Sequence, residues 1–318
     1  MKNILITGSA GFIGYHLAQK LLVKKYKVYG IDNFSNSYEL KIKKLRIKNL
    51  IKNKNFVFYK NDIKNIDKVF KKIKIDLIFH LAAEAGVRKS LKVPIKYIEQ
   101  NISNTIRVFE YAKKNKIKKI IYASSSSVYG DKGIYPSNEK ISLDQPISIY
   151  GLTKIGTENI AYYYHKIFNI NSIGLRFFTV FGPFGRPDMS IFIFIKSLIK
   201  GKTIFLNNYG KNFRDFTYID DVVFYILTIC KKITSKKKFY EVFNIGGEKT
   251  LSLNKLIKKL EKYTQKKTKI KLMPKVNLDP DFSLASSKKI KKFTGKNIST
   301  NFDEGLKQTI SWMKSYIN

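Results

Sequence analysis

Close to its start the chain reads Thr7-Gly8-Ser9-Ala10-Gly11-Phe12-Ile13-Gly14, in which three glycines are spaced by two residues each. A β-branched run, Asn3–Thr7, precedes these glycines, and a helical pattern near 12–24 follows them. Glycines at a strand-to-helix turn permit a tight bend, close approach of the backbone to a pyrophosphate, and close packing of helix on strand. The amino end of the helix adds free N–H groups and a positive dipole end. The pattern predicts a dinucleotide site at Gly8, Gly11 and Gly14, with Phe12 and Ile13 beside it.

The first half of the chain alternates short β-branched runs with helical patterns. The expected strands are Asn3–Thr7, Lys27–Asp32, Asn55–Lys60, Leu77–Leu81, Lys119–Ser124 and Ser172–Phe177. The expected helices lie near 12–24, 38–50, 65–72, 95–115 and 150–168. Such alternation favours a parallel sheet covered on both faces, so we expect an α/β protein built on a Rossmann-type doubly wound parallel sheet.

The second half of the chain is less regular. Its helical patterns lie near 189–200, 220–231, 252–264 and 302–317, with short strands between them. We therefore expect a smaller α/β C-terminal domain that binds the substrate. In this division residues 1–180 form the dinucleotide-binding domain, to which the chain returns near 217–246, and residues 181–318 form the substrate domain.

The chain carries a net charge of +38, from 55 lysines and six arginines set against 23 acidic residues. The lysines are scattered and mixed with Asn and Ile, which indicates a drift in composition, and we expect no nucleic-acid partner. No apolar run reaches the roughly 18 residues of a membrane span, so no membrane insertion is expected. Cys230 is the single cysteine, which excludes an internal disulfide and favours the reducing cytoplasm.

Asp32 closes the second expected strand, at the end where parallel sheets bind their ligands. A carboxylate there accepts hydrogen bonds from the adenosine ribose and repels the 2′-phosphate of NADP, and no arginine follows it nearby in the sequence. We therefore expect NAD, with Asn33 also in contact. Asp62 closes the third strand and, with Ile63, is expected to meet the adenine. The alternative for Asp62 is that it only starts a turn.

Tyr150 and Lys154 form a Tyr-x-x-x-Lys pair that shares one helix face, one turn apart. The ammonium stabilises a phenolate and lowers the tyrosine pKa from about 10 toward neutrality, so Tyr150 can remove a proton from a carbinol. Lys154 can also bond the nicotinamide ribose. Two further pairs of this spacing occur, Tyr162/Lys166 and Tyr263/Lys267, about as many as chance allows. Only the first begins a helix after the fifth expected strand.

That fifth strand ends in Ala123-Ser124-Ser125-Ser126-Ser127-Val128-Tyr129-Gly130. A serine hydroxyl at this edge can bond the reacting oxygen and relay its proton to Tyr150. The alternative is a serine-rich turn without chemistry.

The glycine pattern, His80-Leu81-Ala82-Ala83, Ala123–Gly130 and Tyr150/Lys154 together resemble the nucleotide-sugar epimerases and dehydratases. Four further stretches resemble the UDP-glucuronate 4-epimerases: Ala85-Gly86-Val87-Arg88, Leu175–Pro183, Gly185-Arg186-Pro187-Asp188-Met189 and Asn208–Asp221. The resemblance runs to about residue 250. Beyond it the chain departs from the family, because Ser283-Leu284-Ala285 stands where a Tyr-Ala-Asp type of segment is usual.

The resemblance implies a role for each matched residue. Ser125 would be the catalytic hydroxyl with Ser126 beside it, Tyr150 the base, and Lys154 its partner. NAD would also contact Leu81, Ala82 and Ala83. The diphosphate would be held by Arg88 and Arg214, and the sugar pocket would be lined by Thr179 and Arg186. Homodimers are usual in this family, through helices such as those expected near 95–115 and 150–168. No metal site is expected.

The activity expected from these residues is NAD-dependent epimerisation of a UDP-sugar at C4, through a 4-keto intermediate. Dehydratases carry an Asp-Glu pair after the catalytic hydroxyl, and decarboxylases tend to carry Glu there, whereas this chain has Ser126 and Ser127. Thr179 and the segment 185–189 favour conversion of UDP-glucuronate to UDP-galacturonate, and we expect this reaction to serve surface polysaccharide synthesis.

Several alternatives stay open. The nearest are a UDP-glucose 4-epimerase or another nucleotide-sugar epimerase or dehydratase. A different class would be a non-catalytic NAD-binding regulator or an RNA-binding protein, given the charge. An NADP-linked reductase of a small carbonyl is disfavoured by Asp32.

Overall fold

Strand β1 (Asn3–Thr7) lies at the centre of a large sheet, and Ile4, Leu5 and Ile6 are all buried. Successive side chains of a strand point to opposite faces, so both faces of β1 are covered. The computed structural model describes residues 2–233, 238–276 and 280–317. Two compact units divide the chain. The first unit holds Met1–Gly130, Ser142–Phe177 and Val223–Phe243, and the second holds Asp131–Ile141, Phe178–Val222 and Asn244–Asn318.

The large sheet has the strand order β10-β6-β5-β4-β1-β2-β3. Its strands are β1, β2 (Lys27–Asp32), β3 (Phe56–Lys60), β4 (Leu77–His80), β5 (Lys119–Ser125), β6 (Asn171–Phe177) and β10 (Tyr240–Ile245). The first six pair in parallel. Thr7 of β1 is level with Ile31 of β2 and with His80 of β4. The expected Rossmann-type parallel sheet is thus confirmed, with strand bounds within one residue of those expected.

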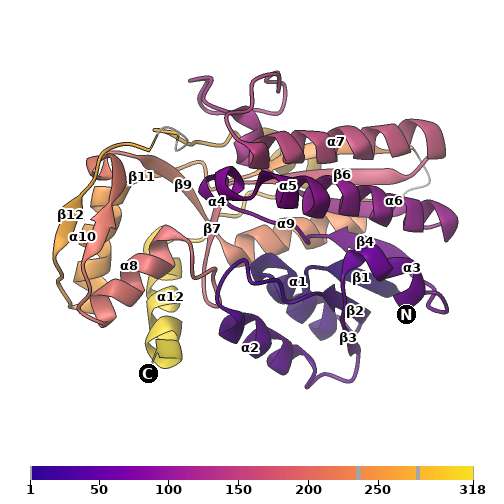
Figure 1. Cartoon of the computed structure of the whole chain (residues 1–318), viewed down its shortest axis with the longest axis horizontal. Helices are drawn as coiled ribbons and strands as arrows, with labels where there is room; N and C mark the ends of the chain where they lie inside the picture. The colour runs from indigo at the N-terminus through magenta and orange to yellow at the C-terminus, as the bar shows by residue number, and fades with distance from the viewer. Residues whose placement is uncertain (1, 234–237, 277–279, 318) are drawn as a thin grey trace. The chain divides into compact units, whose positions relative to one another are not determined.

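The first unit also contains a set of helices. They are α1 (Phe12–Val23), α2 (Leu40–Leu50), α3 (Ile66–Val69), α4 (Val87–Lys92), α5 (Pro94–Tyr97), α6 (Asn104–Lys114), α7 (Ile149–Phe168) and most of α9 (Ile219–Lys232). Helices α6 and α7 lie side by side (Figure 1). One apolar core joins Leu5 and Ile120 of the sheet to Phe109 of α6 and Ala161 of α7. The single helix expected near 95–115 is divided, because a wider helical turn, Ile98–Ser103, separates α5 from α6.

The second unit contains two small sheets and four complete α-helices among its described residues. Strands β7 (Thr179–Phe181), β9 (Phe213–Tyr218) and β11 (Thr250–Ser252) form one sheet, and β8 (Ile204–Leu206) pairs with β12 (Ile270–Leu272). The helices are α8 (Ser190–Ile199), α10 (Leu253–Thr264), α11 (Lys288–Thr294) and α12 (Phe302–Ile317). Buried Asp215 of β9 fixes the neighbouring loops by accepting N–H groups from Gly247 at 2.6 Å and Ala285 at 3.0 Å. Burial raises the pKa of Asp215 to about 6, although these amides oppose the shift.

Candidate active site

The backbone of the turn after β1 leaves no space for side chains at Gly8 and Gly14. Gly8 has a φ of +73°, and its N–H donates to the Ile31 carbonyl of β2 at 2.8 Å. A Cβ on Gly8 would lie 2.7 Å from the amide nitrogen of Ala82, and a Cβ on Gly14 would overlap the carbonyl oxygen of Gly8. The turn and the start of α1 are therefore pressed together as the sequence predicts.

The amino end of α1 suits a dinucleotide phosphate. Gly11 precedes the helix and has no side chain to cap it, and the first turn of α1 holds no acidic residue. Phe12 is buried in that turn, and Ile13 is partly exposed. Backbone N–H groups and the positive dipole end thus remain for an anion, which fits the pyrophosphate of NAD.

Asp32 ends β2 beside this turn. Its carboxylate accepts the N–H of Ala10 at 3.1 Å and the N–H of Phe34 at 2.9 Å. Burial raises the pKa of Asp32, while Lys43 and the two amides lower it. Although no arginine follows Asp32 closely in sequence, the fold brings Arg46 of α2 near it. Arg46 is fully buried and donates to the Ala10 carbonyl at 2.7 Å, so it supports the glycine turn.

The residues expected around the adenosine lie at neighbouring strand ends. Asn33 donates to the Asp62 carboxylate at 2.8 Å, and Asp62 also accepts the N–H of Lys64 at 3.0 Å. Asp62 therefore does start a short helix, Ile63–Asn65, which contains the buried Ile63. That turn role is compatible with an adenine contact, which stays a prediction.

The segment Leu81–Ala83 follows β4 and is tied to β1. The hydroxyl of Thr7 accepts the N–H of Ala82 at 3.2 Å and contacts the His80 Nδ1 at 2.8 Å. Burial, with a smaller contribution from the charge of Lys154, lowers the pKa of His80 to about 3. His80 is therefore neutral and positions this segment, a role the sequence did not reveal.

Tyr150 and Lys154 lie in the first turns of α7, beside the end of β5. The Ser148 hydroxyl caps α7 by accepting the N–H of Gly151 at 3.0 Å. A Cβ on Gly151 would lie 2.5 Å from the Ser127 carbonyl, so the helix start packs against the serine-rich segment. Lys154 Nζ donates to the Ala123 carbonyl of β5 at 2.9 Å and lies 5.9 Å from the Tyr150 ring centre.

The serines expected to act with Tyr150 are at the same edge. Ser125 is the last residue of β5, and its hydroxyl accepts the N–H of Ser127 at 3.2 Å. Ser126 begins the short helix Ser126–Tyr129 that follows. The serine-rich segment is thus a turn, and it stands where a hydroxyl can also face a ligand.

A buried ion pair beneath Lys154 was not expected from the sequence. Glu158 lies one helical turn after Lys154, pairs with Arg176 of β6 at 2.7 Å, and accepts the Ser124 hydroxyl at 2.6 Å. Arg176 also donates to the Tyr129 hydroxyl at 2.9 Å. Burial lowers the pKa of Lys154 to about 8, and the charge of Glu158 raises it in opposition. The spacing of four residues between Lys154 and Glu158 could have indicated from the sequence that the two side chains lie on the same face of the helix.

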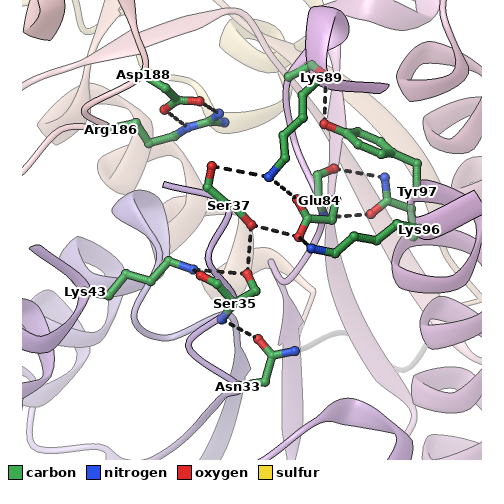
Figure 2. Close-up of polar contacts among 12 residues, drawn as sticks. Asn33, Ser35, Ser37, Lys43, Glu84, Lys89, Lys96, Tyr97, Arg186 and Asp188 are labelled. Atoms are coloured by element: carbon green, nitrogen blue, oxygen red, sulfur yellow. Dashed lines mark hydrogen bonds and ion pairs between the residues drawn. The ribbon is translucent and has the colours of Figure 1, made fainter. Parts of the chain in front are cut away.

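The remaining expected residues divide between the units. Arg88 is exposed on α4 in the first unit. In the second unit Thr179 begins β7, level with Phe216 of β9, and Arg214 lies on β9. Arg186 forms a two-point ion pair with Asp188, at 3.0 Å from Nε and 2.6 Å from Nη2 (Figure 2). The structure therefore gives Arg186 a carboxylate partner that the sequence did not predict.

Two features are absent from the described residues. These residues contain no group of three His, Cys, Asp or Glu side chains placed to hold a metal ion. Nor does any helix within 2–233, 238–276 and 280–317 combine the length and apolarity needed to cross a membrane.

A cavity of about 340 Å³ in the first unit lies at the amino ends of β1, β4 and β5, at the end of the sheet opposite to the glycine turn, and Cys230 lines it.

Comparison with known proteins agrees with this geometry. Residues 4–246 match the model of the NAD dependent epimerase/dehydratase family. The UDP-glucuronate 4-epimerase of Thermodesulfobacterium geofontis is 38% identical over 321 residues, which cover 100% of this chain and 98% of that protein. The crystal structure of UDP-glucuronic acid 4-epimerase from Bacillus cereus, in complex with UDP-glucuronic acid and NAD, superposes with a TM-score of 0.91 at 35% identity over 99% of both chains.

A UDP-glucose 4-epimerase from Thermotoga maritima, solved with UDP-glucose, is also similar, with a TM-score of 0.89 and 30% identity over 99% of this chain and 100% of that one. The family resemblance drawn from the motifs is confirmed by the match over residues 4–246. The chain belongs to the NAD-dependent epimerase/dehydratase family.

Proposed function

We propose that this protein interconverts UDP-glucuronate and UDP-galacturonate by epimerisation at C4, through a 4-keto sugar. The observation that carries the proposal is the placement of Tyr150 and Lys154 against the serine-rich end of β5. The 4-epimerase structure that holds UDP-glucuronic acid and NAD supports the same substrate and cofactor. In this proposal the first unit binds NAD and the second binds the nucleotide sugar.

The residues of the first unit have separable roles. Tyr150 takes the proton of the C4 hydroxyl, and the Lys154 ammonium stabilises the phenolate that this requires. Ser125, backed by Ser126, bonds the reacting oxygen and relays its proton to Tyr150. NAD bound at this site would supply the hydride acceptor for C4 and the hydride donor for the return to the other face of the sugar. The glycine turn and Asp32 hold the cofactor.

Arg186 and Thr179 select the uronate. A carboxylate suits the planar fork of an arginine, which binds two oxygens at once. Oxidation at C4 turns the uronate into a β-keto acid, which loses CO₂ when its carboxylate aligns with the C4 carbonyl π system. An arginine that holds the carboxylate out of that alignment protects the intermediate. Asp188 accepts hydrogen bonds from the Nε and Nη2 donors and so fixes the orientation of this guanidinium.

The other proposed features concern the rest of the molecule. Arg88 and Arg214 bind the diphosphate. A homodimer forms through α5, α6 and α7, which is supported by exposed apolar side chains on these helices: Ile95, Ile106, Leu152, Tyr163 and Ile167. A cytoplasmic location is supported by the single cysteine, and no nucleic-acid partner is proposed.

A panel of UDP-sugars tests the function. The purified protein is incubated with UDP-glucuronate or UDP-glucose, and the products are separated by chromatography. We expect a higher kcat/KM for UDP-glucuronate, with UDP-galacturonate as the product. If UDP-glucose is the better substrate, the second candidate, a UDP-glucose 4-epimerase, replaces the first, in line with the relative solved with UDP-glucose.

A further inference from the structure

Glu84 is a buried carboxylate that the proposed reaction does not use. Its side chain is 2% exposed and ends in three polar contacts (Figure 2). Ser37 Oγ donates to Oε1 at 2.8 Å, Lys96 Nζ lies 3.0 Å from Oε1, and Lys89 Nζ lies 3.5 Å from Oε2. Burial raises the pKa of Glu84, but the Ser37 and Lys96 hydrogen bonds and the lysine charges outweigh it and lower the pKa. Glu84 is therefore an ionised, fully partnered side chain.

The backbone of Glu84 is held as firmly as its carboxylate. Asn101 accepts the N–H of Glu84 at 2.8 Å and donates to its carbonyl at 3.0 Å. Asn101 also donates to the Thr153 hydroxyl of α7 at 2.9 Å. The segment after β4 is thus anchored to two helical elements of the first unit, and Glu84 is a fixed point.

Ser37 belongs to a different loop, the one that follows β2. Its hydroxyl contacts that of Ser35 at 2.8 Å, and Lys43 of α2 donates to the Ser35 carbonyl at 2.8 Å. Lys89 Nζ reaches the Ser37 carbonyl at 3.4 Å. A chain of polar contacts therefore leads from α2 through the β2 loop to Glu84 (Figure 2).

The strand order places this bridge over the glycine turn. β1 lies between β2 and β4 in the sheet, and Gly8 follows Thr7, which is level with both neighbouring strands. The contact between the β2 loop and the β4 segment therefore joins the two chain segments that follow the strands on either side of β1. We propose that Ser37 and Glu84 form a clasp across the glycine turn that slows the release of bound NAD, an inference that rests on the proposed NAD site. Because each epimerisation returns NAD to its starting state, slow release does not limit turnover.

The rate of NAD release tests the clasp. The protein of residues 1–318 is freed of NAD and loaded with radiolabelled NAD, and the label that remains bound is followed after addition of excess unlabelled NAD. Ser37→Ala removes the donor while Glu84 keeps its lysines, and we expect release about tenfold faster, as for loss of a hydrogen bond to a charged group. Glu84→Gln should also release NAD faster. The double variant should be no faster than the faster single variant, because both changes act on the same Ser37–Glu84 contact, Ser37→Ala by removing the donor and Glu84→Gln by removing the charge of the acceptor.

Two controls separate the clasp from a general loosening of the fold. Asp67→Asn breaks an exposed ion pair with Lys114 and should leave the release rate unchanged. The affinity of Ser37→Ala for UDP should equal that of the wild type. Wild-type release rates in both Ser37→Ala and the double variant would overturn the clasp. Failure of a wild-type protein that has first been freed of NAD to take up label would instead overturn the proposed NAD site.

Discussion

Tyr150 is the residue whose removal tests the proposed chemistry most directly. Tyr150→Phe deletes only the phenolic oxygen, and the ring can keep its edge contact with Tyr97, 6.1 Å between centres. We expect turnover to fall by about 10²–10⁴-fold, the usual contribution of a general acid–base group, while NAD stays bound. Tyr162→Phe, at an exposed tyrosine on the same helix that forms another Tyr-x-x-x-Lys pair, is the control and should match the wild type. A Tyr150→Phe enzyme with more than about a tenth of the wild-type rate would contradict the assignment.

Lys154 predicts how activity depends on pH. Its pKa is lowered to about 8, so its ammonium is lost as the pH rises through that value. The neutral amine no longer stabilises the Tyr150 phenolate, and kcat/KM should fall above about pH 8. Because the charge of Glu158 raises this pKa, Glu158→Gln should move the fall to lower pH. The dependence of kcat/KM on pH is measured for the wild type and for Glu158→Gln, with Asp67→Asn as the control. If the fall of kcat/KM at high pH occurs at the same pH in Glu158→Gln as in the wild type, Lys154 does not cause it.

Substitutions of Arg186 and of Asp188 should have opposite effects on the preference for UDP-glucuronate. Arg186→Ala should lower kcat/KM for UDP-glucuronate by roughly 10- to 100-fold, as for the loss of a hydrogen-bonded charge, and should release some UDP-pentose. Asp188→Asn removes the carboxylate that occupies one edge of the guanidinium, and should lower KM for UDP-glucuronate. UDP-glucose kinetics, measured in parallel, should change little in either variant. Equal losses for both substrates after Arg186→Ala would place the arginine outside the uronate site.

Among the secondary-structure elements, β1 and α1 pack closely around the glycine turn. A glycine-to-alanine substitution, which adds one methyl group, tests whether the fold needs this close packing. Gly8 and Gly201 both have a positive φ, +73° and +63°, so alanine at either position carries a left-handed strain of about 1 kcal/mol. Only at Gly8 does the new Cβ also meet backbone, 2.7 Å from the Ala82 nitrogen, whereas nothing lies within 4 Å at Gly201.

Gly8→Ala should therefore lower the free energy of unfolding more than Gly201→Ala does, and should weaken NAD binding. Urea unfolding and titration with NAD measure the two effects. Equal costs at the two positions, with NAD affinity retained, would mean that the turn can widen without consequence.

For the assembly of two chains, the proposed dimer would bury apolar side chains that are exposed in the single chain. Ile106 of α6 is 41% exposed and Ile193 of α8 is 43% exposed, so they are matched positions on different helices. Ile106→Glu should convert a dimer into a monomer in analytical ultracentrifugation, because it places a charge in the interface, whereas Ile193→Glu should remain dimeric. A monomeric wild type, or a dimeric Ile106→Glu variant, would refute the proposal.

The strands of the large sheet and most of the helices could be predicted from short stretches of sequence. Local interactions along the chain determine the strand bounds, the glycine turn and the position of the Tyr150/Lys154 pair. They act through side-chain periodicity and backbone sterics, so each segment can be predicted from its own residues. The pairings that support the site could not be predicted in this way. Glu158 with Arg176, and Glu84 with Ser37, join segments that meet only because of the strand order. A lysine-rich sequence offers many partners for each carboxylate, and burial in the tertiary structure selects among them, because a buried charge is tolerated only where its partners converge.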